Sequence, residues 1–181
     1  MDVPFTKINL TLFMTYITIL ANKLYGPNSQ NNPYLQILYR YNKLLGAVTF
    51  NTSMGILVSW ESVRVLYPTA ANHFIQKTLK LHNISRSVFE FINFTIHMFP
   101  ILYLLKVRKD WIHYSKNFRT IFLSLLIHGS WIKLVPKHYN LNRVYMYNDP
   151  VLTDKQWRNL WLLAFLGHIG AYTYSFRTIS S

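Results

Sequence analysis

Uncharged stretches alternate with clusters of basic residues along the whole chain. Five predominantly apolar stretches of 13 to 18 residues contain no Asp, Glu, Lys or Arg. Each is shorter than the about 20 residues that cross a bilayer core, but flanking aromatic rings and snorkelling Lys or Arg side chains extend such segments. Residues 44–60 carry apolar side chains on every side, whereas a surface helix keeps one charged face. The pattern predicts an all-α, multispanning transmembrane helix bundle.

The prediction is one transmembrane domain over residues 1–181 with about five spans. These spans cover about 3–23, 43–66, 88–106, 118–135 and 157–176. Aromatic residues such as Trp60, Trp111 and Trp131 stand near the ends of the uncharged stretches, where amphipathic rings anchor a helix at headgroup level. The polar stretch from Thr69 to Ser87 is expected outside the apolar core.

Composition supports a membrane environment better than the net charge does. Only 14% of the 181 residues are charged, against roughly a quarter in an average soluble domain, while 51% are hydrophobic. The net charge of +13 resembles that of a nucleic-acid binder, but no motif of a known RNA- or DNA-binding module is present. Basic residues outside the uncharged stretches fit loops that face anionic headgroups. We therefore expect membrane lipids and no nucleic acid as partners.

The basic residues divide evenly between the two sides of the predicted bundle. Alternate loops carry 10 and 9 of the 19 Lys and Arg residues, so the positive-inside rule does not choose an orientation. The absence of Cys excludes disulfides, thiolate metal sites and a Cys nucleophile. No metal or cofactor is predicted, and the expected location is integral to the endoplasmic reticulum or another intracellular membrane.

Histidines inside the predicted spans are the first candidates for chemistry, because an ionisable group in a membrane segment needs a partner or a function. His97 precedes Pro100, which cannot donate to the Ile96 carbonyl and loosens the helix beside the imidazole. His128 and His168 each adjoin a glycine, and this is typical of packing sites. A structural bond to a neighbouring helix remains the alternative interpretation of His97.

Hydroxyl groups are abundant in the first two predicted spans, and a Thr hydroxyl becomes a nucleophile only beside a base. The first and third spans run in the same direction, so Thr6 and His97 fall in the same half of the membrane. Asn9 follows Thr6 by one turn and can orient its hydroxyl or donate to an oxyanion. Thr49 enters from the other side and is the weaker partner. The alternative for any single Thr in a membrane helix is a structural role, in which its hydroxyl donates to a backbone carbonyl of the preceding turn.

Carboxylates do not complete a catalytic triad in this sequence. Glu61 and Glu90 stand at the borders of uncharged stretches, with Arg64 and Arg86 at helical spacing from them. We expect both carboxylates to be ion-paired at the membrane interface.

Four sequence blocks occur in order over about 150 residues. They are Phe5-Thr6-Lys7-Ile8-Asn9-Leu10, Arg64-Val65-Leu66-Tyr67-Pro68, Asn93-Phe94-Thr95-Ile96-His97 followed by Pro100, and Trp131 with His138 and Val144–Pro150. In order and spacing they resemble the androgen-induced family of multispanning, threonine-dependent membrane hydrolases, which cleave fatty acid esters of hydroxy fatty acids. Asn9 stands where that family has Asp, and the family has a helix before the nucleophile helix. The resemblance therefore implies a divergent or N-terminally short member.

The resemblance implies an intramembrane lipid-ester hydrolase with Thr6 as nucleophile and His97 as base. Asn9, Asn93 and Pro100 would support the site. An acyl chain would lie against hydrophobic walls formed by Phe13, Phe91, Phe94 and Phe99. Two other classes remain open: a non-catalytic membrane scaffold or small transporter with structural Thr and His contacts, and a soluble basic helical protein.

Overall fold

The computed structural model describes residues 14–20, 32–115, 118–139 and 152–180, and all secondary structure in these ranges is helical. Residues 14–20 are helical. The further helices are α2 (Pro33–Leu66), α3 (Pro68–His82), α4 (Arg86–Lys106), α5 (Arg108–Ser115), α6 (Phe118–Tyr139) and α7 (Asp154–Ser180). The predicted all-α class is confirmed for the described part of the chain.

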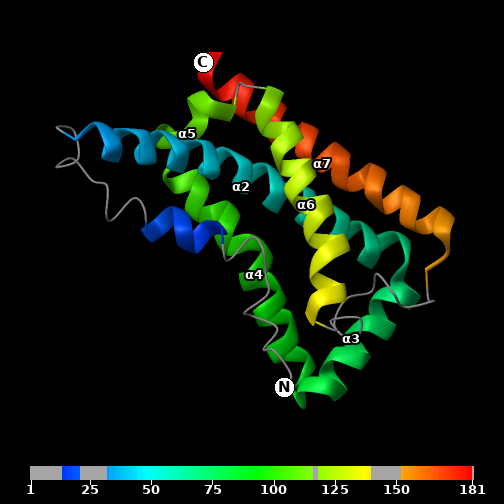
Figure 1. The fold of residues 1–181 in the computed structure, drawn as a ribbon. Helices are drawn as coiled ribbons and strands as arrows, with labels where there is room; N and C mark the ends of the chain where they lie inside the picture. Colours follow the sequence, from blue (N-terminus) through cyan, green and yellow to red (C-terminus); the bar gives the residue numbers. More distant parts are fainter. Residues whose placement is uncertain (1–13, 21–31, 116–117, 140–151, 181) are drawn as a thin grey trace.

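The long helices run in alternating directions around α2, which is 34 residues long. In Figure 1, α7 lies antiparallel beside α2, α4 packs on another side of α2, and α6 crosses the pair. At the α2–α7 contact a Cβ atom on Gly167 would lie 3.0 Å from the Gly55 Cα atom. Such close backbone approach between helices requires small residues on both sides.

Local sequence signals explain where the helices begin and end. Thr153 and Gln156 form a capping box at the start of α7: the Thr153 amide donates to Gln156 Oε1 at 2.8 Å, and the Gln156 amide donates to Thr153 Oγ1 at 3.3 Å. Ser85 caps α4 by accepting from the Val88 amide at 3.3 Å. Asn83 ends α3 in the left-handed conformation, which Asn adopts more readily than most residues.

The largest apolar cluster joins α2, α4, α5 and α7. Trp111 of α5 is 1% exposed, and its ring lies at a centroid distance of 4.9 Å from the Phe50 ring of α2, tilted by 34°. Its indole Nε1 donates to the Leu104 carbonyl at 2.9 Å, which satisfies the polar end of the buried ring. The expectation of an interface anchor at Trp111 is therefore wrong, because α5 folds back and inserts the ring into the core.

Helices occupy four of the predicted spans, and the first span is described only over 14–20. α4, α6 and α7 begin within three residues of their predicted starts, whereas α2 begins at Pro33 and ends at Leu66. By length and composition, α4 is the one described helix that is long and apolar enough to cross a membrane, and Phe118–Ser130 is a shorter apolar segment. The number of spans therefore remains a prediction.

The connectors contain helices that the sequence interpretation did not anticipate. α3 occupies most of the polar stretch from Thr69 to Ser87, and it buries Ala70, Ala71, Ile75 and Thr78 on one face. α5 lies within the basic connector between α4 and α6. Both helices are short, and a short helix is stable mainly when its apolar face packs against a neighbouring helix.

Candidate functional site

His97 lies on the buried face of α4. Asn93 and Pro100 share this face at helical spacing, and both are buried. The His97 ring stacks with the Trp60 ring of α2 at a centroid distance of 6.3 Å. Its Nδ1 atom is buried and has no hydrogen-bond partner among the described residues. Stacking therefore orients the His97 ring, while no described group forms a hydrogen bond with its Nδ1 atom.

The phenylalanines predicted to wall an acyl chain lie on the outer surface of α4. Phe91, Phe94 and Phe99 are 72%, 59% and 45% exposed. They project away from the face that carries Asn93, His97 and Pro100. The three rings therefore lie on the outer surface of α4 and do not enclose the His97 imidazole.

Thr6, Asn9 and Phe13, which the sequence predicts at the site, lie outside the described residues. Three described hydroxyls of α2 follow the structural alternative. Thr49 donates to the Leu45 carbonyl at 2.7 Å, Thr52 to the Val48 carbonyl at 2.9 Å, and Ser53 to the Thr49 carbonyl at 2.8 Å. These are bonds to the preceding turn, the structural role that Thr and Ser side chains commonly have in apolar helices.

The carboxylates at the helix borders share one arginine. Arg64 of α2 lies 3.7 Å from Glu61 and 3.4 Å from Glu90 of α4. The predicted Glu61–Arg64 pair is confirmed. The expected Arg86 partner of Glu90 is wrong, because the packing of α4 against α2 brings Glu90 to Arg64. The resulting ion pair links the two helices that carry Trp60 and His97.

A second polar cluster lies where α6 and α7 meet. Ser124 Oγ of α6 is 2.9 Å from His168 Nδ1 of α7, and His168 Nε2 is 3.3 Å from His128 Nδ1 of α6. Ser124 and His168 are 0% exposed, and His128 is 3% exposed. We call these three residues the Ser124–His168–His128 chain. It joins a hydroxyl and two imidazoles in one buried hydrogen-bonded series.

Glycine in α2 makes room for this chain. A Cβ atom at Gly55 would lie 2.3 Å from His168 Nε2 and 2.4 Å from His168 Cδ2, closer than atoms can approach. The imidazole therefore packs directly on the α2 backbone. Asn51 lies one turn before Gly55 on the same helix face and is 0% exposed. Its side-chain nitrogen and oxygen are both without a hydrogen-bond partner among the described residues.

The sequence interpretation treated His128 and His168 as separate packing sites and did not consider Ser124 or Asn51 for chemistry. His168 does pack tightly on Gly55, but the bonds to Ser124 and His128 were missed. One signal was available, since Ser124 and His128 are four residues apart and share a face of one helix. The partner on α7 has no such signature in the sequence.

No group of three or more His, Cys, Asp or Glu side chains that could hold a metal ion occurs within the described ranges. The two buried polar sites therefore present hydroxyl, imidazole and amide groups in apolar surroundings. These groups can perform nucleophilic and acid–base chemistry. No known protein family, curated protein or solved structure matches the chain.

Proposed function

We propose that this protein is an intramembrane lipid-ester hydrolase that uses His97 as base and Thr6 as nucleophile. The observation that carries the proposal is the buried Nδ1 atom of His97, which no described residue satisfies. An unpaired buried polar atom is costly unless it serves a function or meets an unseen group. The family resemblance of the segments around Thr6 and His97 identifies the chemistry expected there.

The membrane part of the proposal is supported by large apolar side chains on the outer surfaces of the helices. Water would face these side chains in a soluble protein, whereas lipid acyl chains solvate them favourably. The exposed apolar residues on α4, α6 and α7 include Phe91, Phe94, Leu102, Phe122, Leu126, Leu162 and Leu166. α4 is also long and apolar enough to cross a bilayer. We propose five spans, in the endoplasmic reticulum or another intracellular membrane.

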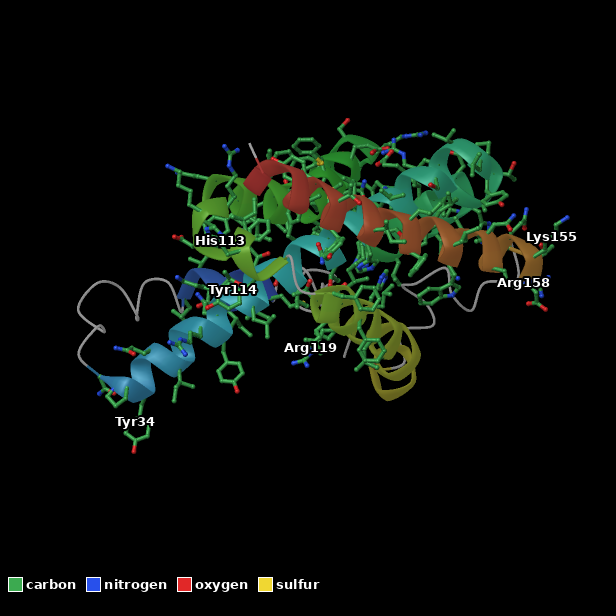
Figure 2. The ribbon with its side chains drawn as sticks, turned by 90° about the horizontal axis from the view of Figure 1, so that it is seen from above. Tyr34, His113, Tyr114, Arg119, Lys155 and Arg158 are labelled. Carbon is green, nitrogen blue, oxygen red and sulfur yellow. The ribbon has the colours of Figure 1, made fainter. Side chains whose placement is uncertain are left out.

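The positions of basic residues agree with helix ends at two membrane surfaces. Figure 2 shows Lys155 and Arg158 at the start of α7, well separated from Arg119 at the start of α6. Because α6 and α7 run in opposite directions, their N-terminal ends belong to opposite sides of a bundle. Carbonate extraction tests this part directly: retention in the membrane pellet is expected, and release into the supernatant would favour a soluble basic helical protein.

In the proposed reaction, Thr6 attacks the carbonyl carbon of a lipid ester while His97 takes the hydroxyl proton. The tetrahedral intermediate collapses, and His97 returns the proton to the leaving alcohol oxygen. Water then attacks the acyl-enzyme, its proton passes to His97, and the fatty acid leaves as Thr6 recovers its hydrogen. Asn93 and Pro100, on the same face of α4, position the base, and the apolar surroundings exclude competing water.

Labelling with a fluorophosphonate probe tests the proposal. The unmodified chain should react, and Thr6→Ala and His97→Ala should each abolish labelling at Thr6. Thr49→Ala is the matched control, because the Thr49 hydroxyl is bonded to the Leu45 carbonyl. Undiminished labelling of Thr6 in His97→Ala would remove His97 from the mechanism.

The second candidate is a non-catalytic membrane scaffold or small transporter. It is favoured by the hydroxyls that bond to their own helix and by the bond between His128 and His168 across two helices. Under this alternative, Thr6→Ala lowers expression or stability but changes no lipid ester level. A lipid ester that accumulates in cells carrying Thr6→Ala at normal protein level would exclude it.

A further inference from the structure

We propose that the Ser124–His168–His128 chain, together with Asn51, is a second nucleophilic centre that forms an acyl-enzyme with a neutral lipid ester. This inference goes beyond the proposed Thr6 chemistry and does not depend on it. It rests on described atoms of α2, α6 and α7.

The hydrogen-bond geometry supplies a nucleophile, a base and an orienting group. Ser124 Oγ is 2.9 Å from His168 Nδ1, within the range required for proton transfer. His168 Nε2 is 3.3 Å from His128 Nδ1, so His128 holds the base ring from its other nitrogen. A nucleophile bonded to a base that a third group orients is the arrangement common to catalytic triads on unrelated folds.

Two proton arrangements are compatible with these contacts. In one, the Ser124 hydroxyl donates to the Ile121 carbonyl at 2.8 Å, His168 Nδ1 donates to Ser124, and His128 Nδ1 donates to His168 Nε2. In the other, the Ser124 hydroxyl donates to His168 Nδ1, and His168 Nε2 donates to His128 Nδ1. The second arrangement activates the hydroxyl. It differs from the first in the direction of that hydroxyl and in the neutral tautomer of both imidazoles, with the His128 proton on Nε2.

Asn51 is suited to stabilise the oxyanion of a tetrahedral intermediate. Its amide nitrogen is buried and without a partner among the described residues. It lies on the face of α2 that carries Gly55, against which the His168 ring packs. An amide donor that is already desolvated and unpaired forms a stronger hydrogen bond as negative charge develops on a nearby oxygen, and this is the property of an oxyanion hole.

The surroundings select a neutral, apolar substrate. Residues 120–132 and 159–176 contain no charged side chain that could pair with a phosphate or carboxylate. The outer surfaces of α6 and α7 expose Phe122, Leu126, Leu162 and Leu166, where an acyl chain can lie. Because Ser124 is fully buried, the ester must reach it by separating α6 from α7. A Cβ atom at Gly129, next to His128, would meet no described atom within 4 Å, so α6 has space there.

The covalent step is acyl transfer to Ser124. Ser124 Oγ forms a bond to the ester carbonyl carbon, and its proton moves to His168 Nδ1 while His168 Nε2 donates to His128. The carbonyl oxygen becomes the oxyanion that accepts from the Asn51 amide. Collapse breaks the bond to the alcohol oxygen, which takes the proton from His168. Water completes hydrolysis by attacking the acyl carbon and giving one proton to His168. His168 returns this proton to Ser124 Oγ as the bond between Oγ and the acyl carbon breaks and the fatty acid leaves.

The test is to map the adduct of a long-chain fluorophosphonate on the full chain in native membranes. The labelled protein is digested, and the peptides that contain Ser124 and Thr6 are analysed by mass spectrometry. We expect an adduct on Ser124 in the folded chain and none after denaturation before labelling. Ser124→Ala should remove it, and His168→Gln should slow its formation by about 100-fold. Ser53→Ala is the matched control, because Ser53 is equally buried and bonded only within α2.

Each outcome of the mapping decides between the two proposals. An adduct on Ser124 supports the second centre, whatever happens at Thr6. An adduct on Thr6 alone overturns the second centre and supports the proposed function. A folded chain with no adduct on either residue contradicts both. Undiminished labelling of Ser124 in His168→Gln overturns His168 as its base. The adduct map of the unmodified chain tests the second centre without any variant, so it does not depend on whether a variant folds.

Discussion

His97 is a partly buried imidazole of α4 and His168 a fully buried imidazole of α7, and their surroundings differ. His168 bonds through both ring nitrogens, to Ser124 and His128, and packs on the α2 backbone at Gly55. His97 has a stacking partner in Trp60 and an Nδ1 atom without a described hydrogen-bond partner. The first histidine is part of the bonding that joins helices, whereas the second is held by ring packing. Low exposure alone therefore does not show whether a histidine is held by hydrogen bonds or by ring packing.

The largest change in the free energy of unfolding is expected for His168→Ala. The substitution removes two hydrogen bonds between helices, leaves Ser124 and His128 without His168, and opens a cavity against Gly55. We expect a loss of about 3 kcal/mol, because membrane interhelical hydrogen bonds contribute modestly and cavities add to them. Detergent-titration unfolding measures it. His113→Ala on the exposed surface of α5 is the control, and an equal loss there would contradict the comparison.

A slightly smaller loss, about 2 kcal/mol, is expected for Gly55→Ala, because the new methyl group overlaps the His168 ring and forces it away from α2. Gly170→Ala is the matched control, since its Cβ atom would meet nothing within 4 Å among the described residues. The double variant Gly55→Ala with His168→Ala should lose less than the sum of the two, because both changes act on one contact. Additive losses would show that Gly55 does not act through His168.

The ion pair between α2 and α4, the helix that carries His97, is expected to stabilise the fold less than the His168 contacts do. Arg64→Met removes both contacts to Glu61 and Glu90, but these side chains are about one-third to one-half exposed. We expect a loss of about 0.5 kcal/mol, reduced further at high salt because partly exposed ion pairs are screened. Unfolding at low and high ionic strength measures it. A loss as large as that of His168→Ala, or one that salt does not change, would show that the two sides are held alike.

The smallest change in stability is expected for His97→Phe. Phenylalanine keeps a ring beside Trp60 and removes a buried nitrogen that has no described partner, so unfolding should change by less than about 0.5 kcal/mol. Loss of the proposed base should nevertheless reduce lipid-ester hydrolysis by about 100-fold or more. The same unfolding titration and a lipid-ester assay measure the two effects. A strongly destabilised variant would instead mark His97 as structural.

Local sequence properties predicted where the helices lie along the chain better than they predicted how the helices pack against one another. α4, α6 and α7 correspond to uncharged apolar stretches, and helix starts such as the Thr153–Gln156 capping box are formed by neighbouring residues. α3 and α5 were not predicted, because their sequences are polar on average and only one face packs on a longer helix. Trp111 was misassigned to the interface because hydropathy does not reveal that α5 folds back.

The candidate sites depend more strongly on tertiary structure. Ser124 and His128 share a face of α6 by sequence spacing alone, but His168 is 40 residues from His128 along the chain. Glu90 likewise meets Arg64 across two helices instead of Arg86 on its own helix. Such partners depend on how each helix is rotated and how closely it approaches its neighbour.

By itself, the sequence determined that the described chain is helical and where its apolar segments lie, because helix formation and hydrophobicity are properties of neighbouring residues. Only the tertiary structure decided that Ser124, His168 and His128 form one hydrogen-bonded series, while His97 keeps an unpaired nitrogen among the described residues. The physical reason is the close contact of Gly55 and Gly167. It sets the separation and rotation of α2 and α7, and so brings His168 to α6.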